Sequence, residues 1–543
     1  MTIDMSNCNG QWPARPRDET TRYLCAATHL DPDYADRAIR EFLIEPTRPV
    51  PASPGVDAVA VLGEAVAART RRKLRDLALI ALAIGVVLVA SVEFLVGWLA
   101  LALLIGVPAT TPPRRTWHVA AYLAVLLAAG ALAYLAPRLL DLPSYQGFSD
   151  LGAVAVAVAM LAVLLADRFV VWGHLHRRFW PNRVTRVVPW LRDRPILRFS
   201  PSRQLTQLRR HAGARPGTSG QSAEPVRLVV YREFVPFVGA GTVDGPWSIA
   251  VPLEELPDAA RTAELTTESL YAGIHEEITS LRSTNTLAPG RRLGELGPGE
   301  VVIVSAHDLI DHLDDAVAAD FLKRPGVAPF GMVHPERARA IRAEPLEWAR
   351  YYRCYQVETW DRDLVVTVFV HVAVGRGALY VEWTPCVLLP VRKEYRAIDR
   401  MSRSVLRPFG QGVLDLLAVP ASLPGRLVRL LSFLRPVPQE RGIPSPELYG
   451  SGRGLRELAA DDDVHNYFQL LDVDRYVKML ESRLVLAVSR MMRAGGYSPA
   501  TFDAQAASVV NNNVQIAGSV GGNVVAGTGN RIGDAAIVTG GRG

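Results

Sequence analysis

The stretch LVVTVFVHVAV (Leu364–Val374) is the clearest strand signal in the chain, because it is rich in β-branched residues and almost entirely apolar. A strand with one face in water alternates apolar and polar residues, so this run predicts a strand covered on both faces. Strand signals flank it at Tyr351–Thr359 and Ala378–Val387, joined by the short turns Asp361-Arg362 and Gly375-Arg376-Gly377. We therefore expect a three-strand antiparallel meander.

Further elements extend the domain around this meander. Strands are predicted at Val226–Tyr231, Pro246–Pro252 and Glu300–Ser305, and helices at Thr266–Ser280 and Leu309–Phe321. Asp472–Asp474 predict the cap of a helix over Arg475–Ala494. Its apolar residues form one stripe, typical of core packing: Val477, Leu480, Leu484, Ala487, Val488 and Met491. Together these elements predict an α+β domain over residues 226–500.

Before this domain lies a block of apolar sequence. Forty-nine percent of the 543 residues are hydrophobic and only 21% are charged. The apolar residues gather in the tracts Leu77–Val107, Trp117–Ala136 and Leu151–Trp172. About 20 apolar residues cross a bilayer core of about 30 Å, so the second and third tracts predict membrane-spanning helices.

The first tract allows two topologies, because 31 residues are too many for one upright helix and too few for two full ones. A short hairpin puts the basic clusters Arg69–Arg75, Arg114-Arg115 and Arg177–Arg186 on one side of the membrane. A single span would put the last cluster outside. The positive-inside rule favours the hairpin, and so predicts four crossings with both termini in the cytosol.

Glu93 is the only charged residue in this first tract. At the tip of a hairpin it would be a polar residue near the interface; within a span it would be an ionisable site of a pore or transporter. Further along, Val405–Leu434 carries apolar patches and runs into the basic, amphipathic stretch GRLVRLLSFLRP (Gly425–Pro436). This run suits either the inner-leaflet surface or packing on the sheet.

Charge and cysteine content bear on the compartment and the partners. The net charge is +6, with no basic stripe interleaved with aromatics, so membrane lipids are expected as partners and nucleic acid is not. The four cysteines form no CxxC pair and no disulfide framework, and the first 30 residues contain no secretory h-region. We therefore expect a multi-pass protein of the cell (inner) membrane.

The predicted organisation has six parts. They are a disordered segment (1–19), a small cytosolic helical module (20–68), a transmembrane block (69–180, with tracts 77–107, 117–136 and 151–172), a linker (181–225), the cytosolic α+β domain (226–500) and a low-complexity tail (501–543).

Motifs that carry chemistry are weak throughout. FVGAGTVDG (Phe237–Gly245) holds a lone GxG without the spacing of a dinucleotide loop. His307 and His312 are five residues apart, so they fall on different faces of a helix, and His371 lies in an apolar strand as a core residue would. The sequence therefore predicts no catalytic, cofactor or metal site and leans against an enzyme.

Several stretches together resemble a family of uncharacterised actinobacterial multi-pass membrane proteins. They are TRYLCAATHLDPDYADRAIREFL, RRKLRD, VVYREFVPFVGAG and the meander YRCYQVETWDRDLVVTVFVHVAVGRGALYVEWTPCVLLPV, within residues 20–400. The resemblance implies membrane location but no activity.

The tail NNNVQIAGSVGGNVVAGTGN (Asn511–Asn530) resembles bacterial amyloid signalling motifs, which are similar to the homotypic interaction motif of receptor-interacting kinases. The positions of the predicted assembly motif are Asn513, Val514, Gln515, Ile516, Gly518, Asn523, Val524 and Val525. Uncharged β-branched, Asn and Gln residues can stack in register between copies of the chain. A flexible tail and a strand added to the edge of a partner's sheet are the alternatives.

Three functions fit these features. The first is a membrane signalling or assembly protein that acts as a homo-oligomer, or with a partner carrying a similar tail. The second is a membrane-tethered hydrolase or small-molecule-binding domain, motivated by the size of the cytosolic domain. The third is an oligomeric pore or transporter, motivated by Glu93.

Overall fold

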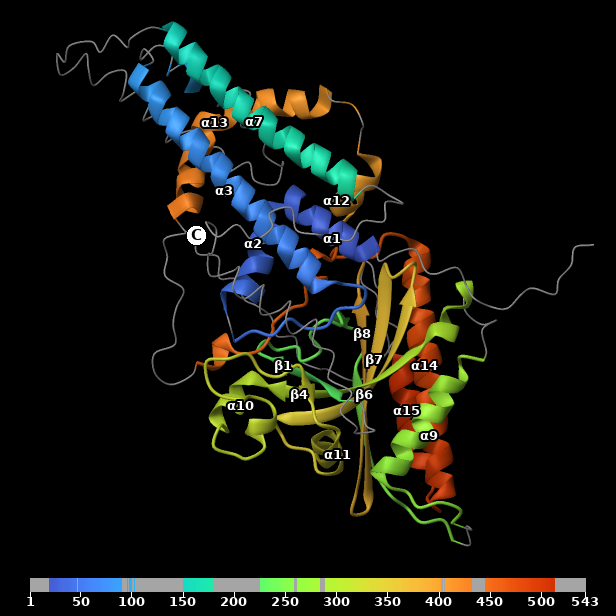
Figure 1. Cartoon of the computed structure of the whole chain (residues 1–543). Helices are drawn as coiled ribbons and strands as arrows, with labels where there is room; N and C mark the ends of the chain where they lie inside the picture. The colour runs from blue at the N-terminus through green and yellow to red at the C-terminus, as the bar shows by residue number, and fades with distance from the viewer. Residues whose placement is uncertain are drawn as a thin grey trace, which may run out of the picture.

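The structure, a computed structural model, has a helical part at one end and a β-sheet domain at the other (Figure 1). It describes residues 19–45, 47–89, 150–179, 225–257, 261–283, 289–401, 404, 406–431 and 445–512, with a few single positions between 95 and 102. The helical part contains α1 (Glu19–Leu30), α2 (Pro32–Ile39), the π-helical turn η1 (Arg40–Ile44), α3 (Ala58–Val89), α7 (Asp150–Arg178) and α13 (Leu406–Leu431).

The sheet domain is built on an eight-stranded mixed sheet in the order β2-β8-β7-β6-β4-β1-β5, with β3 also paired to β8. The strands are β1 (Val226–Tyr231), β2 (Thr242–Val243), β3 (Trp247–Pro252), β4 (Gly297–Ser305), β5 (Met332–Val333), β6 (Ala349–Thr359), β7 (Leu364–Gly375) and β8 (Ala378–Leu388). Strands β1 and β4 are parallel, and the other pairs are antiparallel.

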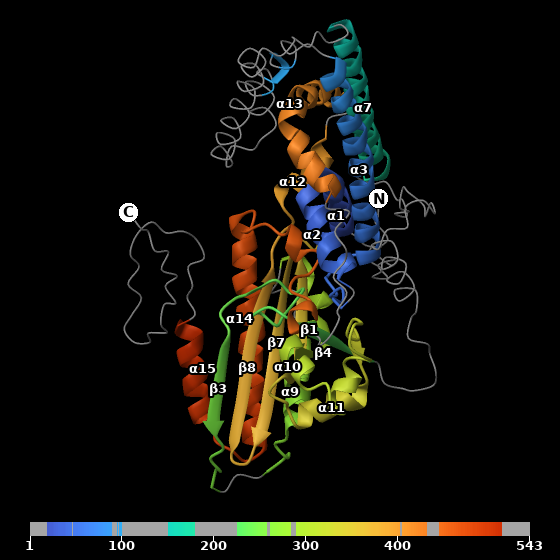
Figure 2. The same cartoon turned by 90° about the vertical axis from the view of Figure 1, so that its left-hand side faces the viewer.

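The remaining helices connect or follow the strands; among them, α12 (Lys393–Arg396) packs against α1 and η11 (Glu457–Ala459) against α2. They are α9 (Thr267–Ser280), η6 (Pro289–Glu295), α10 (Ala306–Asp311), η7 (Ala318–Asp320), α11 (Pro335–Ala343), α12 (Lys393–Arg396), η8 (Ala397–Arg400), η10 (Pro446–Leu448), η11 (Glu457–Ala459), α14 (Tyr467–Ala494) and α15 (Ala500–Asn512). Helices α9 and α14 pack together and against β7, and α15 lies against β3 (Figures 1 and 2).

Burial of β7 explains its apolar sequence. Its first nine residues, 364–372, are all buried. Val368 and Val370 belong to the core that includes residues of α9 and α14. On the opposite face the Phe369 ring packs against that of Phe237, with ring centroids 4.5 Å apart. The prediction that both faces of this strand are covered is therefore confirmed, as are the two neighbouring strands of the meander.

The N-terminal helices share a core with the segments that follow the meander. Tyr34 and Leu62 are buried in one cluster with Tyr395 and Leu455. The Tyr395 hydroxyl donates a hydrogen bond to Asp31 Oδ2 at 2.6 Å, and the same aspartate caps α2 as the Asp31-Pro32 pair predicts. Residues far apart in the chain therefore hold the two parts of the molecule together.

The predicted fold class, a four-crossing membrane block with a separate cytosolic α+β domain, is wrong. In the part of the chain that the structure describes, one helix, Gly152–Arg178, is long and apolar enough to cross a membrane. The first tract begins inside α3, which runs unbroken from Ala58 to Val89, and the hairpin tip predicted near Glu93 lies outside the described residues. The rest is the large mixed sheet with its helices. The tract Trp117–Ala136 lies outside the described residues.

Two helix predictions also need correction. Leu309–Phe321 is not one helix but α10 and the short η7, because α10 ends at Asp311. Helix α14 begins at Tyr467, where the Asn466 side chain accepts a hydrogen bond from Gln469 N at 3.0 Å. The Asp472 carboxylate, the expected cap, instead accepts from Trp360 Nε1 at 3.0 Å.

Helix α13 contains the predicted amphipathic run up to Leu431, and its main contacts are with α7 and α3. Val419 of α13 is fully buried with Leu79 of α3 and Met160 of α7. The alternative of packing on the sheet therefore gives way to packing on the two long apolar helices.

Candidate metal centre in the helical part

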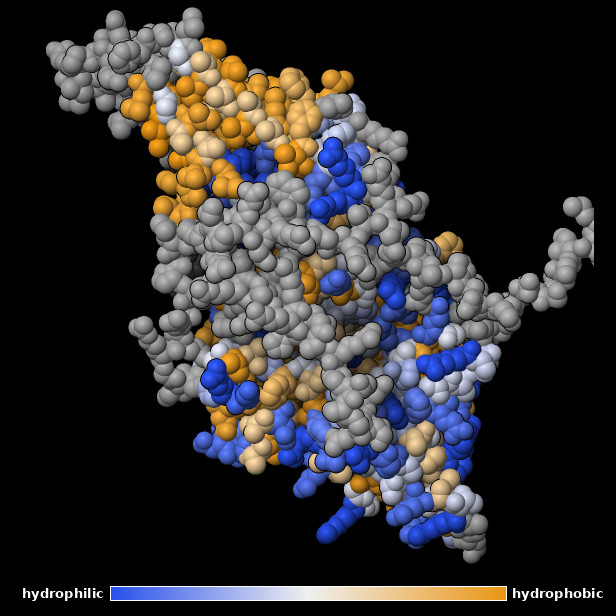
Figure 3. All heavy atoms as spheres, in the orientation of Figure 1, coloured by the Kyte–Doolittle hydropathy of each residue, from blue (hydrophilic) through white to orange (hydrophobic). Residues whose placement is uncertain are grey.

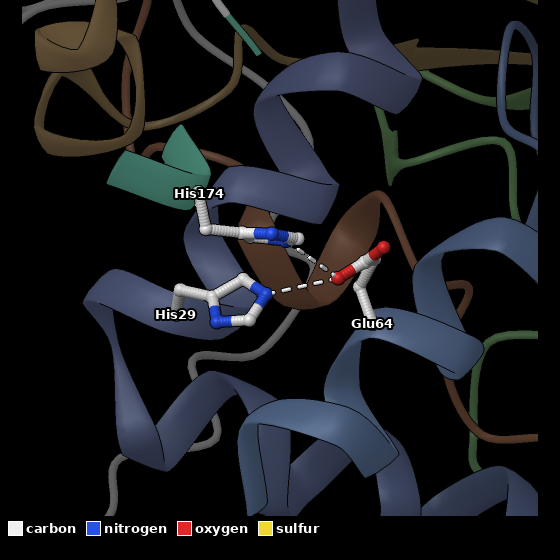
Figure 4. A group of neighbouring side chains, drawn as sticks. All are labelled: His29, Glu64 and His174. Atoms are coloured by element: carbon white, nitrogen blue, oxygen red, sulfur yellow. Dashed lines mark hydrogen bonds and ion pairs between the residues drawn. The ribbon is translucent and has the colours of Figure 1, made fainter. Parts of the chain in front are cut away.

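Three ionisable side chains meet where α1, α3 and α7 pack together (Figure 4). Nε2 of His29 lies 3.0 Å from Oε2 of Glu64, and Nε2 of His174 lies 3.1 Å from the same oxygen. One nitrogen or oxygen of each residue lies within 4.8 Å of those of the other two. Two imidazoles and one carboxylate are a ligand set that zinc accepts in proteins.

The local sequence places each of these residues. Helix α1 must end before Asp31, which caps α2, so His29 falls in its last turn. Glu64 lies near the start of α3, where the helix contacts α1 and α2. His174 lies near the end of α7, and its imidazole packs on that of His29 with ring centroids 4.8 Å apart.

Burial dominates the electrostatics of this cluster. The Glu64 side chain has no exposed surface, and those of His29 and His174 are 6% exposed. Burial lowers the pKa of His29 to about 4, so its imidazole is neutral near pH 7. For Glu64, burial raises the pKa, but hydrogen bonds from His174 and His29 outweigh it and lower the pKa to about 2. The carboxylate is therefore ionised.

Two buried polar atoms of the cluster make no hydrogen bond within the described part of the chain: Nδ1 of His29 and Oε1 of Glu64. Oε1 lies 3.9 Å from Nη1 of Arg178, which is an ion-pair distance but not a hydrogen bond. Most buried polar groups are hydrogen-bonded, so the cluster has capacity for another partner.

A second buried polar group, a layer of ion pairs, joins α3 to α7 and α13. Asp167 Oδ2 lies 3.1 Å from Arg75, and Asp76 Oδ1 lies 2.5 Å from Arg426 and 2.9 Å from Arg75. The side chains of Asp76 and Asp167 are only 4% and 8% exposed. Charges buried this deeply require partners, so this layer fixes the register of the three helices.

A pocket of about 270 Å³ lies beside α7, next to η8 and the start of α13. Leu30, Trp172, Leu175, Ile398 and Met401 give it a mainly apolar lining. Leu30 and Leu175 are the chain neighbours of His29 and His174. Arg168, Glu394 and Gln411 add polar groups to its lining.

The residues that the sequence singled out lie elsewhere. Glu93 and the tail positions Asn513, Val514, Gln515, Ile516, Gly518, Asn523, Val524 and Val525 fall outside the described residues. His371 is buried, and its Nδ1 lies 2.9 Å from the Tyr351 carbonyl oxygen, which confirms a satisfied core residue. His307 is 74% exposed and pairs with Asp311 on its own helix, α10.

Sequence reasoning missed His29, Glu64 and His174, which are distant in the chain. A signal was present, because Glu64 is the one acidic residue in AVAVLGEAVAA and His174 follows the apolar run FVVWG. A lone ionisable group in an apolar helix needs a partner when buried. One sequence does not reveal which residue that partner is.

Fold and site define a two-part protein, with a helical part that carries a buried His-Glu-His cluster and a domain built on a mixed sheet. The AbeC-like domain family matches residues 246–526, which are 281 of the 543 residues. The chain belongs to the AbeC-like domain family. No curated protein and no solved structure matches it. The match includes the tail positions named above, whereas His29, Glu64 and His174 precede it.

Proposed function

We propose that α3, α7 and α13 attach the protein to a lipid bilayer, with the sheet domain outside the bilayer on the cytosolic side. The observation that carries this proposal is the exposure of α7. Only 11% of its most apolar 18-residue stretch is buried, although a core helix of a soluble protein would be mostly buried.

The neighbouring helices extend this apolar surface. Large apolar side chains at least 40% exposed are Leu74, Leu77, Ile84, Val87 and Leu88 on α3, Val154, Val158 and Val170 on α7, and Leu406, Phe409, Leu427, Val428 and Leu431 on α13. In Figure 3 hydrophobic residues cover this end of the molecule, and hydrophilic ones predominate on the sheet domain. Large continuous apolar patches are rare on soluble monomers and mark interaction surfaces.

Cations at the edge of this surface support the same orientation. Arg168 and Arg429 are 39% and 52% exposed, close to the apolar residues of α7 and α13. Arginines beside an apolar segment favour the anionic cytoplasmic leaflet. The buried thiols of Cys354 and Cys386, which form no disulfide, suit a reducing compartment.

Fractionation of cells expressing the full chain tests the proposal. The wild-type protein should remain in the membrane pellet after alkaline carbonate extraction. Val158→Lys places a charge on the outward face of α7, at a cost of about 2.5–3.5 kcal/mol near the bilayer centre, and should shift protein to the supernatant. Met332→Lys, at a 52% exposed position on β5, is the matched control and should not. A wild-type protein in the supernatant would refute membrane attachment.

We further propose that the tail acts in homotypic or partner assembly, as expected of a signalling or assembly protein. The extension of the family match to residue 526 supports a role for residues 513–525 in the domain. A peptide of residues 508–534 should nucleate thioflavin-binding aggregates at high micromolar concentration. A peptide that stays monomeric would contradict this second proposal.

A further inference from the structure

We propose that His29, Glu64 and His174 bind one zinc ion, which ties the N-terminal helices to α3 and α7. The site would use Nε2 of each histidine and the carboxylate of Glu64. It goes beyond membrane attachment and does not depend on it, because all three residues are placed by packing within the helical part.

The geometry is that of converging ligands. Both imidazole nitrogens face a single carboxylate oxygen at 3.0 and 3.1 Å (Figure 4). With zinc–nitrogen and zinc–oxygen bonds of about 2.0–2.2 Å, ligand atoms around a tetrahedral ion lie a little over 3 Å apart. The three ligand atoms lie within 4.8 Å of one another, so the two imidazoles would move closer together around an ion.

The chemical state of the ligands also suits a metal ion. The three side chains offer two imidazole nitrogens and a carboxylate, which are ordinary zinc ligands. Neutral imidazole with carboxylate favours zinc over magnesium or calcium, which prefer all-oxygen sites. Nη1 of Arg178 lies 3.9 Å from Oε1 of Glu64, so this arginine would stabilise and orient the carboxylate without binding the ion itself.

A second observation that supports a metal ion is a buried oxygen of Glu64 that lacks a hydrogen bond. Oε1 of Glu64 is buried without a hydrogen bond in the described part of the chain, so it can supply a fourth bond if the carboxylate binds in bidentate fashion. Enclosure of the cluster argues for a structural ion, because a catalytic zinc site keeps a position open to water or substrate. The segments it would join are 35 and 110 residues apart in the chain.

Metal titration of the full-length chain in detergent tests the proposal. Protein stripped with a chelator should take up about one equivalent of Co²⁺, with the visible absorption of a tetrahedral site, and Zn²⁺ should displace it. Zn²⁺ should also raise the Tm of the stripped protein, because a ligand that binds only the folded state stabilises it. No spectrum and no rise in Tm for the wild-type protein would overturn the proposal without recourse to a variant.

Substitutions then locate the site. His29→Gln and His174→Gln should each weaken Zn²⁺ binding by about tenfold or more. His176→Gln is the matched control on the same helix, because Nδ1 of His176 contacts the Trp172 carbonyl oxygen at 3.0 Å and the residue is not in the cluster. Unchanged affinity in His29→Gln and His174→Gln, or an equal loss in His176→Gln, would place the ion elsewhere and refute the assignment.

Discussion

The helical part and the sheet domain differ in the side chains that they expose. In the helical part Asp76 and Arg426 are buried as an ion pair, while Ile84 and Val87 are 58% and 60% exposed. In the sheet domain α14 buries Leu484 completely and exposes the ion pair between Lys478 and Asp474. Both parts have apolar cores, but the helical part exposes large apolar side chains where α14 exposes charged ones.

This difference is the one expected if α3, α7 and α13 face lipid, as we propose. In water, apolar burial drives packing, as in the sheet domain. Between helices whose outer faces are apolar, apolar packing gives little discrimination, and ion pairs and hydrogen bonds specify which faces meet. The layer of Asp76, Asp167 and their arginines serves this purpose between α3, α7 and α13.

The largest effect is expected from Asp76→Ala. Asp76 pairs with Arg426 and Arg75, and its removal leaves buried arginine charge without a partner. We expect a loss of about 3–5 kcal/mol in the free energy of unfolding, measured by denaturant titration in detergent. Asp474→Ala removes an exposed pair with Lys478 and should cost less than about 1 kcal/mol. Similar losses in the two variants would contradict the contrast between the two environments.

Leu484→Ala should produce the next largest effect, in the sheet domain. Leu484 is fully buried in the core between α14 and the sheet, so truncation should cost about 2–5 kcal/mol. Leu486, two residues along the same helix, is 42% exposed, and Leu486→Ala should change stability by no more than about 0.5 kcal/mol. Denaturant titration that ranked the two variants equally would show that α14 does not pack as described.

His371 should make stability depend on pH. Burial lowers its pKa from 6.5, so the unfolded chain binds the proton more readily in the window just below pH 6.5. Stability is therefore lost as the pH falls through this window, by at most about 1.4 kcal/mol per pH unit for one proton. Facing groups are the Tyr351 carbonyl, the Tyr352 and Tyr380 rings, Glu382, which raises the pKa, and Arg350, which lowers it.

The variant His371→Gln checks this pH dependence. It should flatten the slope of unfolding free energy between pH 5 and 7, measured by denaturant titration at each pH. His307→Gln, at a 74% exposed position, should leave the slope unchanged and serves as the control. A slope that is the same in wild type and His371→Gln would assign the dependence to other groups.

Local pattern was enough to predict the sheet domain but not the helical part. The run Leu364–Val374 predicts a strand covered on both faces because successive residues of a strand point to opposite faces, and nearly all of these residues are apolar. The parallel pairing of β1 with β4 joins residues about 70 positions apart, which no local period encodes. In the helical part, hydropathy marks the apolar tract from Leu77, but it does not show that α3 packs against α7 and α13.

The candidate metal centre could not be predicted because its three residues come from three helices. His29 depends on the cap at Asp31, Glu64 on the packing of α3 against α1, and His174 on the packing of α7. Each residue alone is an ordinary polar side chain in an apolar helix. They become candidate metal ligands only because the fold brings both histidine nitrogens to Oε2 of Glu64.

The smallest effect is expected from Val87→Ser, on the outward face of α3. Its neighbour Val86 is 1% exposed and packs with α7 and α13, whereas Val87 is 60% exposed. Val86→Ser buries a hydroxyl in an apolar contact and should cost about 1–3 kcal/mol of unfolding free energy in detergent. Val87→Ser faces the surrounding medium and should cost no more than about 0.5 kcal/mol. If Val87→Ser were the more damaging of the two, the face that we assign to lipid would instead be packed against protein.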